Sequence, residues 1–267
     1  MSEVEINPYE KFLNDAGLLS GGVPGKSAAA VNYVIFFTPR SGSTWLTDML
    51  RSLGTVGNPD EWLNERYLTL ELQQLGKVDH ATLLRWLVSS HSTANSVFGI
   101  EVDFFRLDYA DSRFRFMDFF PPETRYFYLT RYNFVAQAIS LYRAVESGRF
   151  HAVDGASDRS VQYDAGKIRD WVLHVLQQEY GFEVYFRDKR VEPVRYSYEG
   201  LCGSPFSVVS DIHWRVLGKA PPSAPASASP YVKLSDSESQ AWERQFRDDN
   251  HDFIEHWERN RGRLTAY

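Results

Sequence analysis

Apolar residues alternate along the chain between short continuous runs and longer stretches at helical spacing. The run from Asn32 to Thr38 is β-branched and aromatic throughout, which predicts a strand buried on both faces. The same criteria predict further strands at Val97–Val102, Arg125–Thr130 and Val194–Tyr198. Helical spacing follows over 43–53, 61–88, 133–147 and 164–187. Strands that alternate with helices predict an α/β fold with a central parallel sheet flanked by helices.

The two ends of the chain differ from this pattern. Residues 1–30 are polar and rich in small residues, so we expect a flexible N-terminal arm followed by one domain over 31–267. The segment 219–230, KAPPSAPASASP, predicts a Pro/Ala-rich surface loop. Residues 236–263 predict one charged helix whose apolar stripe serves as core or as a dimer contact; the stripe contains Trp242, Phe246, Phe253 and Trp257.

Composition and charge narrow the class of protein. The 267 residues are 43% hydrophobic and 24% charged, which is typical of a globular protein. A net charge of −6 argues against nucleic-acid binding, so an anionic ligand must be held locally. A single cysteine, Cys202, and the absence of zinc-like spacing predict no disulfide and no metal. The acidic N-terminus and the lack of an 18-residue apolar run predict a cytoplasmic protein without a membrane span.

The loop after the first strand has the composition of an anion-binding site. It reads Thr38-Pro39-Arg40-Ser41-Gly42-Ser43-Thr44 and opens a helix. Backbone N–H groups at a helix N-terminus bind oxyanions, and an arginine with three hydroxyls adds donors. The alternative is an ordinary strand-to-helix turn in which Ser43 is only the N-cap.

This loop resembles a known family. Pro39-Arg40-Ser41-Gly42-Ser43-Thr44-Trp45-Leu46 is similar to the 5′-phosphosulfate loop of sulfotransferases that use 3′-phosphoadenosine 5′-phosphosulfate (PAPS). Arginine at position 40 resembles the bacterial carbohydrate sulfotransferases, the trehalose 2-sulfotransferase and lipopolysaccharide sulfotransferase-like group. The resemblance implies a P-loop-like sulfotransferase fold and a nucleotide site formed by Arg40, Ser41, Gly42, Ser43, Thr44 and Trp45.

A second stretch is similar to the 3′-phosphate site of the same family. Leu129-Thr130-Arg131 ends a predicted strand, and Ser140 lies about two turns into the next helix. The resemblance implies that Arg131 and Ser140 bind the 3′-phosphate. Taken alone, Arg131 could be a capping or salt-bridge residue and Ser140 a surface serine.

The third similar stretch, Gly57-Asn58-Pro59-Asp60-Glu61-Trp62, places Glu61 where the family has its proposed general base. Two positions depart from the family. Glu101 replaces the lysine of a glycine-x-lysine pattern, and Asn58 replaces a carboxylate.

The resemblance implies an enzyme that transfers the sulfuryl group of PAPS, without a metal, to a hydroxyl of a carbohydrate, glycolipid or small metabolite. Glu61 and Arg40 would be its catalytic residues, and relatives of this kind often form homodimers. Two alternatives stay open. A P-loop kinase or NTPase would need the loop lysine that is absent here, and a non-catalytic nucleotide-binding protein could share the same fold.

Overall fold

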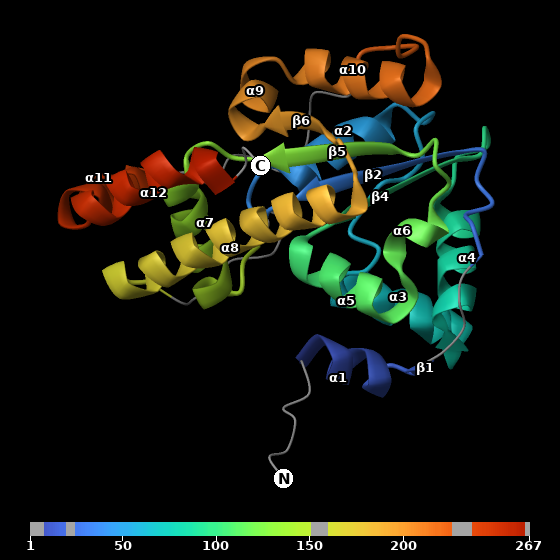
Figure 1. Ribbon diagram of the computed structural model, residues 1–267, viewed down its shortest axis with the longest axis horizontal. Helices are drawn as coiled ribbons and strands as arrows, with labels where there is room; N and C mark the ends of the chain where they lie inside the picture. The colour runs from blue at the N-terminus through green and yellow to red at the C-terminus, as the bar shows by residue number, and fades with distance from the viewer. Residues whose placement is uncertain (1–7, 20–24, 151–159, 226–236, 265–267) are drawn as a thin grey trace.

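The computed structural model describes residues 8–19, 25–150, 160–225 and 237–264 (Figure 1). Four parallel strands form the central sheet in the order β4-β2-β5-β6, with β2 at Val31–Phe37, β4 at Val97–Val102, β5 at Arg125–Thr130 and β6 at Val194–Ser197. All four predicted strands are confirmed to within a residue. Helices cover both faces, so the predicted α/β class is also confirmed.

The central strand β2 explains the layered core, because alternate residues face opposite sides of a strand. Tyr33, Ile35 and Phe37 pack on one side against α2 (Ser43–Ser52), α9 (Tyr198–Gly203) and α10 (Pro205–Leu217). Val34 and Phe36 pack on the other side, where the helices are α3 (Glu65–Leu75), α4 (His80–His91), α5 (Phe104–Phe114), α6 (Phe116–Phe119) and α8 (Ala165–Lys189). Both faces of β2 are therefore buried, as its apolar run predicts.

A third apolar cluster joins α7 (Phe134–Ser147) and α8 to the C-terminal helices at one end of the sheet (Figure 1). The single charged helix expected over 236–263 is wrong, because α11 (Ser237–Asp249) and α12 (His251–Leu264) are separate helices. They part at Asn250, whose side-chain amide donates to the Phe246 carbonyl at 3.1 Å. The predicted apolar stripe is core within this chain, since Trp242 and Phe246 are buried in the cluster.

The N-terminal segment differs in part from the expected flexible arm. Residues Pro8–Asp15 form α1, and Leu18–Leu19 form β1, which pairs with β3 (Val78–Asp79). Leu13 and Leu18 are buried in the domain core. The expectation of an arm over 1–30 is therefore wrong for residues 8–19. Residues 1–7 and 20–24, like 226–230 of the expected Pro/Ala-rich loop, lie outside the described residues.

None of the helices within the described ranges is long and apolar enough to cross a bilayer.

Candidate active site

The candidate site lies where the carboxyl ends of the strands meet, which is the usual ligand position in a parallel sheet. The strand β2 leads into the loop Thr38–Gly42, and β4 leads to Asp103. Arg131 follows β5, and Tyr198 follows β6. Four segments that are far apart in the sequence thus contribute to one edge of the sheet.

The loop after β2 has an unusual backbone, with φ of +66° at Arg40 and +88° at Gly42. Its conformation is fixed from outside by the buried side chain of Gln137 on α7. The Gln137 amide donates to the Thr38 hydroxyl at 2.9 Å and to the Pro39 carbonyl at 2.7 Å. These two hydrogen bonds stabilise the conformation of the loop.

The N-terminus of α2 is open to an anion. Its N-cap is Gly42 and no side chain caps the first turn, so the expectation that Ser43 could be the N-cap is wrong. The backbone N–H groups of Ser43, Thr44 and Trp45 in that turn are of the kind that helices leave unpaired. The Ser41 hydroxyl is buried and has no hydrogen-bond partner. These features suit the oxygen atoms of a phosphate or sulfate.

Arg40, Arg131 and Ser140 come together although they lie on three different segments. The Arg40 Nε atom donates to the Ser140 hydroxyl at 3.0 Å, and a terminal nitrogen donates to the Phe150 carbonyl at 2.6 Å. A terminal nitrogen of Arg131 approaches the Arg40 carbonyl oxygen at 3.4 Å. The sequence predicted two separate groups of phosphate-binding residues, the loop with Arg40 and the pair Arg131 and Ser140. In the structure Arg40 contacts both members of that pair.

Tyr198 belongs to this site, although the sequence pattern gave it no role. The Arg131 guanidinium lies over the Tyr198 ring at 4.5 Å from its centre. The same ring lies against Gly42, where an added Cβ would come within 2.8 Å of the tyrosine Cδ2. Tyr198 ends a predicted strand, and this position alone could have indicated from the sequence that it lies at the site. Burial lowers the pKa of Arg131, and no hydrogen-bond acceptor satisfies its buried Nε atom.

The segment Gly57–Trp62, which was predicted to carry the base, runs along the free edge of β4. The Glu101 backbone N–H donates to the Asp60 carbonyl at 3.0 Å. Gly57 lies so close to the strand that a Cβ would come within 2.9 Å of the Val97 carbonyl oxygen, and its φ is +77°. Only glycine fits both conditions. The edge strand thereby fixes where the base segment lies.

Glu61 is partly buried and held by two neighbours. Its backbone N–H donates to Asp60 Oδ1 at 2.9 Å, and the Asn64 side chain donates to its Oε2 at 2.9 Å. Burial raises the pKa of Glu61 to about 7, and the charge of Asp103 raises it further than the Asn64 hydrogen bond lowers it. A carboxylate with such a pKa can accept a proton near neutral pH.

Aromatic stacking anchors the other end of this segment. The Trp62 ring stacks on His91 with centres 3.5 Å apart, and Glu71 accepts from His91 Nε2 at 3.0 Å. The Trp62 indole N–H donates to the Asn58 carbonyl at 3.1 Å. Asn58, one of the two departures from the family pattern, therefore contributes its backbone to the fold of the segment.

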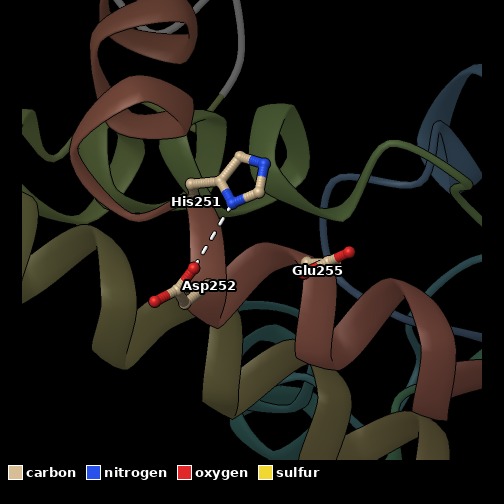
Figure 2. Close-up of side chains that lie close together, drawn as sticks. All are labelled: His251, Asp252 and Glu255. Atoms are coloured by element: carbon tan, nitrogen blue, oxygen red, sulfur yellow. Dashed lines mark hydrogen bonds and ion pairs between the residues drawn. The ribbon is translucent and has the colours of Figure 1, made fainter.

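A group of possible metal ligands lies away from this site, on α12. His251, Asp252 and Glu255 place ligand atoms within 4.8 Å of one another. Figure 2 shows His251 pointing to Asp252, whereas Glu255 lies apart on the next turn. The Glu255 carboxylate forms an ion pair with Arg259 on the same helix. His251 and Asp252 are exposed, and acidic side chains at a helix start are common without a metal because they interact favourably with the helix dipole.

Comparison with known proteins shows the family of this chain. Residues 32–249 match the family described as Stf0 sulphotransferase, a span that contains every predicted site residue. The chain belongs to this sulfotransferase family.

Two named relatives are trehalose 2-sulfotransferases. The chain is 24% identical to that of Mycolicibacterium smegmatis over 81% of this chain and 94% of the relative. It is 25% identical to that of Mycobacterium tuberculosis over 83% of this chain and 96% of the relative. Among solved structures, a sulfotransferase domain from the curacin biosynthetic pathway is similar with a TM-score of 0.46 and 16% identity, covering 82% of this chain and 83% of that chain.

Proposed function

We propose that this protein transfers the sulfuryl group of PAPS to a hydroxyl of a carbohydrate acceptor. The observation that carries the proposal is the contact of Arg40, Arg131 and Ser140 beside the open N-terminus of α2. We assign the 5′-phosphosulfate of PAPS to the α2 N-terminus and its 3′-phosphate to Arg131 and Ser140. The trehalose 2-sulfotransferase relatives make trehalose the first acceptor to test.

The residues fit the charge of the donor nucleotide. Arg40, the Ser41, Ser43 and Thr44 hydroxyls and the first N–H groups of α2 would hold the 5′-phosphosulfate. Arg131 and Ser140 would hold the 3′-phosphate. Gly42 permits close approach of the backbone, and Trp45 packs partly into the core beneath the loop.

In the proposed reaction, Glu61 accepts the proton of the acceptor hydroxyl as its oxygen attacks sulfur. The sulfur–oxygen bond to the 5′-phosphate breaks, and 3′-phosphoadenosine 5′-phosphate leaves. Arg40 and the α2 amides stabilise the negative charge that develops on the departing phosphate oxygen. As in phosphoryl transfer, positioning and electrostatics provide most of the rate enhancement. The reaction needs no metal.

The first experiment measures transfer of labelled sulfate from PAPS to trehalose, other sugars, glycolipids and small hydroxyl metabolites. Glu61→Gln should lower kcat by about 10²- to 10⁴-fold because it removes the base. Its affinity for 3′-phosphoadenosine 5′-phosphate should stay close to that of the unchanged protein. Glu123→Gln, a substitution of an exposed residue before β5, is the matched control and should leave both values unchanged.

Each other outcome rejects a specific part of the proposal. Unchanged turnover in Glu61→Gln would reject this base. Tight binding of the nucleotide without transfer to any acceptor would favour the non-catalytic nucleotide-binding alternative. Mg²⁺-dependent ATP binding would favour the kinase alternative. The acceptor, a homodimer and a cytoplasmic location stay predictions.

A further inference from the structure

Glu101 is a buried carboxyl that the proposed reaction does not use. It lies on β4 opposite Ile35 of β2, and its side chain is only 1% exposed. Neither of its oxygen atoms has a well-aligned hydrogen-bond partner. An unpaired charge at such a depth is costly, because the protein interior does not replace the lost hydration.

The groups around Glu101 come from three elements. Asp60 and Glu61 lie on the base segment and repel a negative charge at Glu101. The Ser43 hydroxyl at the start of α2 and the Arg51 guanidinium favour that charge. Tyr33 of β2 also faces the carboxyl, but its hydroxyl donates to the Val56 carbonyl at 2.7 Å.

Arg51 does not serve Glu101 as a dedicated ion-pair partner. One terminal nitrogen lies 2.5 Å from Asp60 Oδ2 and 2.9 Å from the Pro59 carbonyl, and the other is 3.4 Å from Asp48. The next arginine, Arg106, forms ion pairs with Asp103 and Glu65. Arg51 is thus engaged by Asp60 and Asp48. Glu61 follows directly after Asp60, whose carbonyl accepts from the Glu101 N–H at 3.0 Å, and a negative charge on Glu61 opposes ionisation of Glu101.

Two neighbouring carboxyls in this situation hold one proton between them. Glu101 is the more deeply buried, whereas Glu61 keeps the Asn64 hydrogen bond that favours its ionised form. We propose that Glu101 is a positioning residue that stays protonated and forms an acid–carboxylate pair with Glu61, the proposed base.

The catalytic role of this pair rests on the proposed function. The pair explains how Glu101 can lie beside a proposed anion site. A charged Glu101 next to the N-terminus of α2 would repel the anionic donor, whereas a neutral acid does not. The proton on Glu101 also leaves the pair with a single negative charge, which resides on Glu61 and can accept the acceptor's proton.

The first test reads the proton directly and does not require turnover. At pH 7 the infrared difference spectrum of the unliganded parent protein minus Glu101→Gln should contain the carbonyl band of a protonated carboxylic acid, and the difference spectrum removes the contribution of Glu61, whose pKa is about 7. Glu123→Gln, the exposed control, should leave the band unchanged. If the difference spectrum lacks the band, Glu101 is ionised and the proposal is wrong.

The second test measures whether the charge of Glu61 affects the protonation of Glu101. In Glu61→Gln, the acid band should disappear at a pH about one unit lower or more, because the neighbouring negative charge is gone. An unchanged midpoint would show that the two carboxyls do not interact and would overturn the pair. Neither infrared measurement uses PAPS, so a failure of the proposed function leaves both results valid.

The third test applies if transfer is observed. Because glutamine mimics a protonated glutamate, Glu101→Gln should keep kcat within about threefold and leave the acid limb of kcat/KM within about 0.3 pH unit. If Glu101 were instead ionised, its removal would lower the acid limb by about one unit or more. That result would overturn the proposal.

Discussion

Glu61 illustrates how a single side chain can be suited to function at the expense of stability. Its carboxyl is placed among Asp60, Asp103 and Glu101, and burial raises its pKa to about 7. In the unfolded chain the same group titrates near 4.5. Above pH 7 the folded protein must therefore accommodate a charge that the unfolded chain solvates freely.

This difference predicts that Glu61→Gln stabilises the protein. At pH 8 the gain in the free energy of unfolding should be on the order of 1–3 kcal/mol, because glutamine carries no charge to desolvate. The gain should shrink as the pH falls from 7 towards 4.5 and should be absent well below 4.5, where glutamate is protonated in both states. Urea unfolding at pH 8 and pH 5 measures it. A gain that is equal at both values, or a loss at pH 8, would contradict the raised pKa.

Arg131 offers a second prediction for a single residue. Its guanidinium is buried against Tyr198 and beside the Arg40 carbonyl. If it binds the 3′-phosphate, Arg131→Ala should weaken binding of 3′-phosphoadenosine 5′-phosphate by about 10- to 100-fold and that of AMP far less. Titration calorimetry of both ligands provides the comparison. Equal losses for the two nucleotides would remove Arg131 from the 3′-phosphate role.

The turn between β2 and α2 depends on a glycine at position 42. Gly42 has φ of +88° and lies against the Tyr198 ring, whereas Gly54 at the end of α2 has φ of +65° and open space around it. Both positions have a left-handed backbone. Only at Gly42 would an added Cβ also clash with a neighbouring side chain.

Gly42→Ala should therefore cost more than Gly54→Ala. The control should lose about 1 kcal/mol of stability from its backbone conformation alone. Gly42→Ala should lose more and should also weaken nucleotide binding, because Tyr198 must move away from Arg131. Thermal unfolding and nucleotide titration of both variants test this. Equal losses of stability with unchanged affinity would show that contact with Tyr198 is unimportant.

At the level of elements, sequence patterns predicted what depends on local chemistry. The continuous apolar run of β2 gave its boundaries to within a residue, and Asn133 gave the N-cap of α7, since both signals are local. The break at Asn250 and the packing of α1 were missed. Asn250 interrupts no apolar periodicity, and α1 is held by contacts such as that of Tyr9 with the Leu63 carbonyl, 54 residues away.

The candidate site also combines residues that local sequence motifs predict with contacts that depend on the tertiary fold. Arg40, Glu61, Arg131 and Ser140 could be named from motifs, but their mutual contacts could not be deduced from spacing. Gln137 and Tyr198 support the loop through the tertiary fold. Glu101 stood out only as a departure from a pattern, and its meaning depends on burial and on the saturation of Arg51.

At the scale of the whole molecule, the C-terminal helix α12 contacts the edge of the sheet that carries the candidate site. Arg261 on α12 forms a bidentate ion pair with Glu179 of α8, with N–O distances of 2.6 and 2.8 Å. It also donates to the backbone carbonyls of Arg131 and Tyr132, each at 2.6 Å. The last described helix thus holds the segment that carries the proposed 3′-phosphate ligand.

Removing the Arg261 side chain should lower both the stability of the protein and its affinity for the nucleotide. Arg261→Ala leaves the buried Glu179 carboxylate without its cation, which should lower the free energy of unfolding by about 3–5 kcal/mol. The released Arg131 segment should also weaken binding of 3′-phosphoadenosine 5′-phosphate several-fold. Arg259→Ala, which removes an exposed ion pair on the same helix, should change stability by less than about 1 kcal/mol.

Arg261→Lys separates charge from geometry. Lysine keeps the positive charge beside Glu179 but cannot reproduce the planar bidentate contact while also reaching two carbonyls. Its stability should fall between those of the parent protein and Arg261→Ala, with nucleotide affinity following the same order. If Arg261→Ala loses stability but binds the nucleotide unchanged, α12 supports the fold alone and the Arg131 segment is positioned from within the sheet.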